Sequence, residues 1–357
     1  NSSSGAAELW TLKASAGTSW SAEMDEDGDV TYTNASTINA VEFSPNWSTD
    51  KNILVVSSNA TDVDLQVFVY TSSSVKNWND SASGFTGDWE DGIALDGIAG
   101  GLAAASIAMP ETYLGSDESE RIVFVGVAAA TTTDESVYRI VDTNPLEFDT
   151  WSDGKPGPVQ AIAYDDDTDT LIAGDYNASQ VYSWLTPMSG SSPNAQRIRS
   201  LQQPGGDDQV SVAWSNGKAI AGTQGDESAI SYSTDEGYTF TDSFLIDTEL
   251  DVMDDVAVSA DGAIVYLATH DTTEGTGAYD ASIWRDDGGW VRIHSNDDVA
   301  DANVDFLTRV APDDASVLYI SSTGTTNMWV TKDSGDTWTS IPALSITGSD
   351  TVLDFVV

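Results

Sequence analysis

Short runs of β-branched and aromatic residues alternate with polar residues along most of the chain, and Gly, Asp, Asn and Ser bound each run. Alternation with a period of two places successive side chains on opposite faces of a strand. The runs therefore predict β-strands. No stretch has the apolar spacing of a long amphipathic helix, so we expect an all-β chain.

The predicted strands recur in groups of four. The clearest group has runs at 209–215, 218–225, 228–235 and 239–247, and two further groups of the same order follow at 253–295 and 304–343. Earlier groups are less regular. Four strands in each unit of roughly 45 to 65 residues are typical of a β-propeller, in which four-stranded blades surround a central channel.

We expect a single β-propeller domain over residues 1–357. Its approximate blades are residues 38–91, 102–154, 159–204, 209–247, 252–295 and 304–343. The apolar run at 351–357 predicts the innermost strand of a closing blade, and residues 8–34 would supply its other strands. N- and C-terminal strands would then close the ring and leave no sheet edge open. Seven blades are favoured, and six or eight stay open as alternatives.

Two predicted hairpin turns share the pattern Ser/Thr-x-Asp-x-Gly-x-Thr-aromatic. Its positions are Ser233, Asp235, Gly237, Thr239 and Phe240 in one turn, and Thr331, Asp333, Gly335, Thr337 and Trp338 in the other. The pattern resembles the Asp-box, or BNR repeat, of sialidases, sortilin-type receptors and xyloglucan-cleaving propellers. The Asp can accept hydrogen bonds from its own turn and Gly permits a positive φ. We therefore expect these residues to be structural.

A second resemblance lies in residues 41–57, which are similar to bacterial and archaeal cell-surface and surface-layer proteins with BNR-like repeats. This resemblance implies an extracellular or cell-surface protein. The first residue is Asn1 rather than Met, which favours a processed mature terminus or a fragment from which the targeting segment has been removed. Asn-x-Ser/Thr sequons permit glycosylation, and they begin at Asn1, Asn34, Asn46, Asn59, Asn79 and Asn177.

The charge balance is strongly acidic, with 58 acidic and 13 basic residues and a net charge of −45. A chain of this charge repels nucleic acid and anionic membranes and attracts cations. Cysteine is absent, so disulfides and thiolate metal sites are excluded. The longest apolar stretches are too short to span a membrane.

Calcium is the cation that the sequence suggests, although the fold requires no cofactor. Alternate carboxylates on a tight loop can converge on Ca²⁺, and this spacing occurs at Asp25, Asp27 and Asp29 and at Asp165, Asp167 and Asp169. Ordinary solvated turns are the alternative. Among the tryptophans, Trp47, Trp89 and Trp151 lie near predicted loops and are candidates for stacking on a ligand.

Catalytic motifs are not evident. Sialidases use three arginines to hold a carboxylate, and none of the seven arginines here has the sequence context of that family. A glycosidase needs only two carboxyl groups a few ångströms apart, and Asp254, Asp255, Asp305 and Asp354 lie on predicted innermost strands or their ends. Only His270 and His294 could assist a serine nucleophile, and neither lies in a nucleophile-elbow context.

These observations favour a non-enzymatic protein of the cell surface, with no catalytic residues. It would be an envelope, surface-layer or filament-associated component whose partners are other copies, other envelope proteins or glycans. The alternatives are a secreted glycoside hydrolase-like or carbohydrate-binding propeller, and a receptor-like or assembly-factor binding module.

Overall fold

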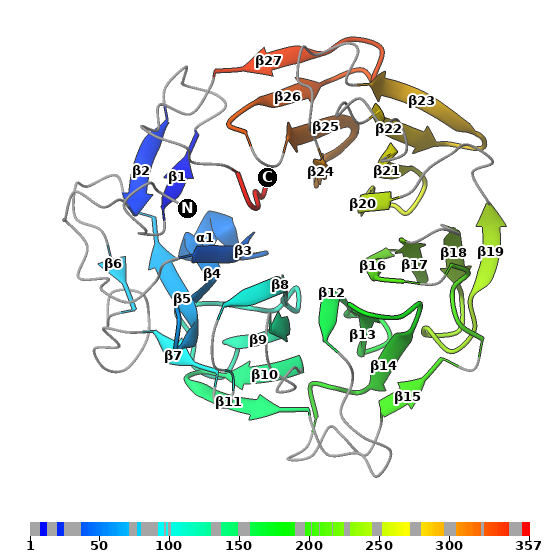
Figure 1. Cartoon of the computed structure of the whole chain (residues 1–357). Coiled ribbons are helices and arrows are strands. Elements are labelled where there is room, and N and C mark those ends of the chain that lie inside the picture. The colour runs from blue at the N-terminus through cyan, green and yellow to red at the C-terminus, as the bar shows by residue number, and fades with distance from the viewer. Residues whose placement is uncertain are drawn as a thin grey trace.

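The computed structural model is a ring of antiparallel sheets around a central axis (Figure 1). It describes residues 8–12, 20–24, 37–70, 77–79, 92–95, 98, 101–129, 137–148, 158–189, 197–200, 202–206, 208–215, 217–224, 229–244, 252–271, 280–295, 305–322, 325–342 and 352–357. Within them the one helix is the four-residue α1 (Trp47–Asp50). The expected all-β propeller is confirmed.

Each sheet is built from consecutive strands, so the chain completes one sheet before it begins the next. The first is β3 (Thr37–Phe43), β4 (Asn52–Ser58), β5 (Val63–Val69) and β6 (Asn77–Trp78), with β7 (Ile93–Ala94) also paired to β5. The second is β8 (Leu102–Ala108), β9 (Ile122–Ala129), β10 (Val137–Val141) and β11 (Asn144–Glu147). The third is β12 (Val159–Asp165), β13 (Thr170–Asp175), β14 (Val181–Leu185) and β15 (Arg197–Arg199).

The remaining sheets follow the same order. The fourth is β16 (Val210–Ser215), β17 (Lys218–Thr223), β18 (Ile230–Ser233) and β19 (Thr241–Phe244). The fifth is β20 (Val252–Val258), β21 (Val265–Asp271), β22 (Asp280–Asp286) and β23 (Trp290–Ser295). The sixth is β24 (Phe306–Ala311), β25 (Asp314–Ser322), β26 (Met328–Thr331) and β27 (Thr339–Ile341), and β1 (Leu9–Thr11) pairs with β2 (Ser21–Met24) in a two-stranded sheet.

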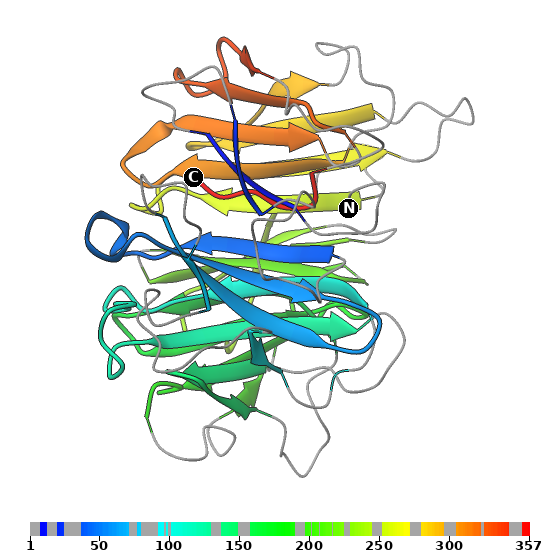
Figure 2. The ribbon, with the colours of Figure 1, turned by 90° about the vertical axis from the view of Figure 1, so that its left-hand side faces the viewer.

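The core lies in layers between neighbouring sheets, which stack around the ring (Figure 2). One layer contains Ile172 and Val181 of the third sheet against Val210 and Ala221 of the fourth, all of them buried. The second strand of each sheet has a neighbour on both edges and both faces, so its sequence is almost continuously apolar. β4, for example, reads NILVVSS and is buried along its whole length.

Innermost strands of neighbouring sheets touch around the axis, from β3 to β8 and onward to β24. They are joined by a recurring hydrogen bond from a backbone N–H to a polar side chain of the preceding sheet. Ile162 N–H donates to Ser106 Oγ (3.2 Å), and Thr308 N–H donates to Asp255 Oδ2 (2.8 Å).

Residues 352–357 bring the C-terminus to the centre of the ring, between β24 and β3 (Figure 1). Asp354 Oδ2 accepts the N–H of Val41 at 2.9 Å, as Asp255 does for the next sheet. The segment thus occupies the place of an innermost strand, but the prediction that it forms one is wrong, because residues 352–357 have no strand ladder. Residues 29–34 lie outside the described part, and seven blades stay a prediction.

Two turns with the Asp-containing pattern have the same internal hydrogen bonds. Asp235 Oδ1 accepts the Thr239 N–H at 2.8 Å, and Asp235 Oδ2 accepts the Thr239 hydroxyl at 2.6 Å. Asp333 makes the same two bonds to Thr337, at 2.8 and 2.5 Å. The aromatic residue that follows, Phe240, is fully buried against the preceding sheet. The second turn contains Gly335 and ends in Trp338, whose Nε1 donates to the Ile293 carbonyl of the preceding sheet at 3.1 Å.

Candidate functional site

Strand order explains which side chains meet at the end of the ring. A sheet of four antiparallel strands begins and finishes at the same end of the ring, so the innermost strands β20 and β24 both start there. The second strand β21 finishes at that same end. Asp254 near the start of β20, His270 at the finish of β21 and Asp305 just before β24 are therefore brought together, although 51 residues separate the two aspartates.

His270 lies between the two carboxyl groups. Its Nδ1 is 2.7 Å from Asp254 Oδ1 and 3.3 Å from Asp305 Oδ1. One ligand atom from each of the three residues can be chosen so that all lie within 4.8 Å of one another. The Asp254 and His270 side chains are 7% and 10% exposed, whereas the Asp305 side chain is 53% exposed. The cluster is thus buried on one side and open to solvent on the other.

Burial raises the pKa of Asp254 to about 6, even though the hydrogen bond with His270 acts in the opposite direction. Its second oxygen, Oδ2, is buried and has no hydrogen-bond partner among the described residues. An unpaired buried carboxylate oxygen is costly. Among the described residues, His270 and Asp305 therefore leave one of the two Asp254 oxygens without a hydrogen bond.

A β-bulge aims Asp254 toward this cluster. The β20–β21 register shifts between Met253 and Asp255, so Asp254 is the extra residue, and β3 has the same bulge at Asn39. In that first sheet Asn39 Oδ1 accepts the Ser58 hydroxyl at 2.8 Å. Ser58 occupies the register position of His270. The neutral pair Asn39–Ser58 therefore suffices for a side-chain contact at this bulge. The fifth sheet has the ionisable pair Asp254–His270 in the same place.

The other two aspartates singled out in the sequence form a separate cluster around Arg309 of β24. Arg309 Nη1 donates to Asp255 Oδ2 at 2.6 Å, and its Nη2 donates to Asp354 Oδ1 at 2.7 Å. Because Asp354 also accepts the Val41 N–H, this ion network joins the fifth sheet, the sixth sheet, the C-terminal segment and the first sheet. We call Arg309, Asp255 and Asp354 the closure cluster, and its role is structural.

Glu42 of β3 faces the same guanidinium without a direct ion pair among the contacts of the described residues. Burial raises the pKa of Glu42 to about 7, against the attraction of Arg309, and Asp354 raises it further. Asp255, Asp354 and Glu42 thus all lie near the single positive charge of Arg309. Glu42 is the one of the three that has no direct ion pair with it.

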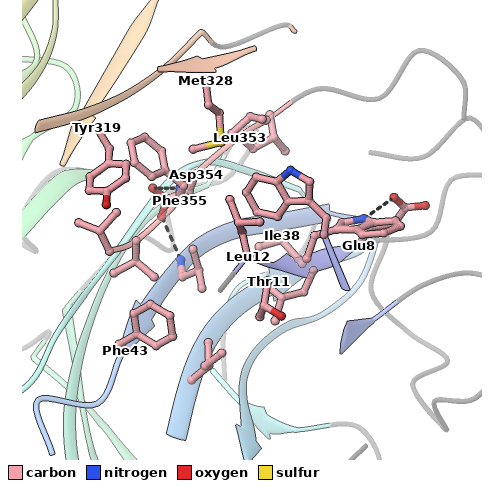
Figure 3. Close-up of a pocket in the computed structure, with 18 of the residues that line it drawn as sticks. Glu8, Thr11, Leu12, Ile38, Phe43, Tyr319, Met328, Leu353, Asp354 and Phe355 are labelled. Carbon is pink, nitrogen blue, oxygen red and sulfur yellow. Dashed lines mark hydrogen bonds between the residues drawn. The ribbon is translucent and has the colours of Figure 1, made fainter. Parts of the chain in front are cut away.

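A cavity of about 370 Å³ lies beside the closure cluster, between β1, residues 352–357 and the two flanking sheets (Figure 3). Its lining is mostly apolar. Two of its polar side chains have partners, since Glu8 accepts the Trp10 indole N–H at 3.1 Å and the Thr11 hydroxyl donates to Glu23 at 2.8 Å. The cavity lies where the ring closes. Asp254, His270 and Asp305 are not among the residues that line it.

The sequons fall into three groups in the structure. Asn1 and Asn34 lie outside the described residues. Asn79 is 5% exposed, and the Asn46 amide donates to the carbonyls of Glu111 and Tyr113, so both side chains are engaged in the folded chain and glycosylation at them stays a prediction. Asn177 is exposed and Asn59 is partly exposed. Glycosylation stays a prediction at those two.

Of the two proposed calcium loops, the structure describes only the one at residues 165–169. Asp25, Asp27 and Asp29 lie outside the described residues. In the other loop Asp165 accepts hydrogen bonds from the backbone and hydroxyl of Thr168, and Asp169 accepts one from Tyr164. Calcium at Asp165, Asp167 and Asp169 stays a prediction.

The candidate stacking aromatics are only partly described. Trp89 and Trp151 lie outside the described residues. The Trp47 ring is 4.7 Å from the Phe43 ring and 5.9 Å from the Tyr70 ring, between centroids. Trp47 is thus packed within the first sheet, and a ligand role for it stays a prediction.

The chain resembles solved propellers in fold but not in sequence. Hydrazine synthase from Kuenenia stuttgartiensis aligns with a TM-score of 0.57 at 13% identity, over 86% of this chain and 79% of that chain. A GH74 xyloglucanase from Xanthomonas campestris aligns with a TM-score of 0.54 at 14% identity, over 86% of this chain and 45% of that chain. No protein-family model and no curated protein sequence matches. The shared property is the β-propeller fold, and the Asp-box pattern stays a resemblance.

The prediction that the chain is not an enzyme is wrong, because propellers of similar fold are found in enzymes. Both solved propellers named above belong to enzymes, so the β-propeller fold does not exclude catalysis. The physical reason is that a ring assembles its site from the ends of separate strands, so no linear motif is required. Among the described helices, none is long and apolar enough to cross a membrane.

Proposed function

We propose that the protein is an extracellular propeller that binds and hydrolyses neutral polysaccharide at the end of the ring where β20 and β24 begin. The observation that carries the proposal is the carboxyl pair Asp254 and Asp305, which two neighbouring sheets present on either side of His270. The resemblance to a GH74 xyloglucanase in fold supports this class of substrate.

The separation of the two carboxyl groups suits glycoside hydrolysis. Their ligand atoms lie within 4.8 Å of each other, which is closer to the roughly 5 Å of retaining glycosidases than to the roughly 7–9 Å of inverting enzymes. Asp305 is half-exposed and can reach a bound chain, whereas Asp254 is held in place by His270. We therefore expect hydrolysis with retention of the anomeric configuration.

The charge of the chain narrows the substrate. A net charge of −45 repels polyanions such as nucleic acids, polyuronates and sialylated glycans. Uncharged glucans carry no such penalty, and their hydroxyl groups are hydrogen-bond donors for carboxylates.

The test measures reducing ends released from xyloglucan and from a mixed-linkage β-glucan. We expect Asp254→Asn and Asp305→Asn each to lower kcat/KM by about 100-fold or more, which is the usual contribution of positioned acid–base groups. Glu118→Gln is the matched control, because it removes one exposed acid far from the site in sequence. Absence of hydrolysis by the wild-type chain, or unchanged rates in both Asp variants, would contradict the proposal.

Assembly in the cell envelope is a second candidate. Among the described residues, Tyr238, Val291 and Leu353 are the large apolar side chains with exposed surface, so contacts between copies would be polar and cation-bridged rather than hydrophobic. Calcium at the acidic turns would supply such bridges. Light scattering with and without Ca²⁺ tests this role, and a monomer under both conditions would contradict it.

A further inference from the structure

We propose that Asp254, His270 and Asp305 form a binding site for a divalent transition-metal ion, with Zn²⁺ and Mn²⁺ preferred to Ca²⁺. The inference deepens the proposed function, because a metal at this site would regulate the carboxyl pair that the hydrolysis uses. It does not depend on that function for its own test.

Distances within the cluster suit a shared ion. Two ligands that each lie about 2.1 Å from a metal are at most about 4.2 Å apart. His270 Nδ1 is 2.7 Å from one carboxylate and 3.3 Å from the other, and the three ligand atoms all lie within 4.8 Å. The side chains therefore need only a small rearrangement to converge on one ion.

Asp254 gives the second, independent observation. Its side chain is 93% buried, and its Oδ2 has no hydrogen-bond partner among the described residues. A metal ion would compensate this buried oxygen. The neutral pair Asn39 and Ser58 at the same register position of the first sheet shows that the bulge does not itself require an acid.

The ligand types select the metal. An imidazole nitrogen with two carboxylates suits Zn²⁺ and Mn²⁺, whereas Ca²⁺ prefers oxygen ligands only. Three protein ligands also leave coordination positions for water or another molecule. Asp305 lies on the exposed side of the cluster, so an ion can enter from solvent past this residue.

Metal occupancy and hydrolysis by the carboxyl pair exclude each other. A bound ion engages Asp254 and Asp305 at once, so neither carboxylate is available to a glycosidic bond. On this basis Zn²⁺ should inhibit polysaccharide hydrolysis, and a chelator should restore it.

Calorimetric titration of the full chain with ZnCl₂ tests the site in the absence of any polysaccharide, with excess Ca²⁺ present to occupy exposed acidic groups. We expect one Zn²⁺ per chain. The double variant Asp254→Asn/His270→Ser should weaken this binding by more than about 10-fold, because even outer partners of metal ligands contribute about 10- to 100-fold to affinity. It recreates the Asn39–Ser58 pair of the first sheet, so the bulge keeps a side-chain contact that the fold already uses.

Asp305→Asn is the second variant, since its half-exposed side chain can be changed with little effect on folding, and Glu118→Gln is the charge-matched control. Equal Zn²⁺ affinity in the wild type and in both site variants, or binding that excess Ca²⁺ abolishes, would overturn the proposal. Zn²⁺ binding without polysaccharide hydrolysis would instead contradict only the proposed function.

Discussion

Glu42→Gln should stabilise the ring at neutral and alkaline pH. Glu42 is desolvated beside a guanidinium that Asp255 and Asp354 already neutralise, and its pKa is raised from 4.5 to about 7. Below pH 4.5 the carboxyl is neutral in both the folded and unfolded states. Between pH 4.5 and 7 the unfolded chain loses the proton first, so stability falls as pH rises. Above pH 7 the loss is complete and amounts to about 3 kcal/mol.

The glutamine variant removes this ionisation from both states. Its unfolding free energy should match that of the wild type at pH 4 and exceed it by up to about 3 kcal/mol at pH 8. For a chain of this length that corresponds to a rise in Tm of roughly 4 °C. Scanning calorimetry at both pH values measures the difference, with Glu118→Gln as the control for general charge repulsion. An equal stabilisation at pH 4 and pH 8, or none at pH 8, would refute the reasoning.

Two further substitutions test the turns and the closure cluster. Gly335→Ala should destabilise the chain by about 2–4 kcal/mol in urea unfolding, because φ is +100° and a Cβ would lie 2.6 Å from the Ile293 Cβ. Gly217→Ala, at φ +71° with nothing within 4 Å, should cost only about 1 kcal/mol, and equal losses would contradict the steric argument. Arg309→Met should cost about 3 kcal/mol at pH 7, since it leaves Asp255 and Asp354 without their cation, and an unchanged Tm would show that the cluster does not hold the ring closed.

The fold could be predicted because its signals are local and repeated. The runs at 209–215 and 218–225 coincide with β16 and β17, and the Asp-containing turns at Asp235 and Asp333 make the same side-chain bonds. The closing segment could not be predicted to the same degree. Residues 352–357 have the apolar run of a buried strand, but whether they join a ladder depends on partners at the opposite end of the chain.

The candidate site could be predicted only in its parts. Asp254, Asp255, Asp305 and Asp354 stand out as acids near innermost strands, but sequence alone gives no way to pair them. Asp254 and Asp255 are neighbours in the chain, yet the bulge directs them to different partners, one to His270 and the other to Arg309. The usable signal is the position of His270, which is one of only two histidines and lies near the end of the second strand of a regular unit.

Those two adjacent aspartates have different roles: Asp255 contacts the next sheet, and Asp254 contacts His270 at the end of the ring. An ordinary strand would turn successive side chains to opposite faces, and a bulge adds one residue that is free of the ladder. Asp255 stays in the ladder and accepts the N–H of Thr308 in the next sheet, as Ser106 accepts the N–H of Ile162. Asp254 is the added residue, and the N–H of Thr308 is bound by Asp255 instead. Changing the added residue from Asn, as in β3, to Asp, as in β20, therefore alters the chemistry at the end of the ring while the contact between sheets is kept.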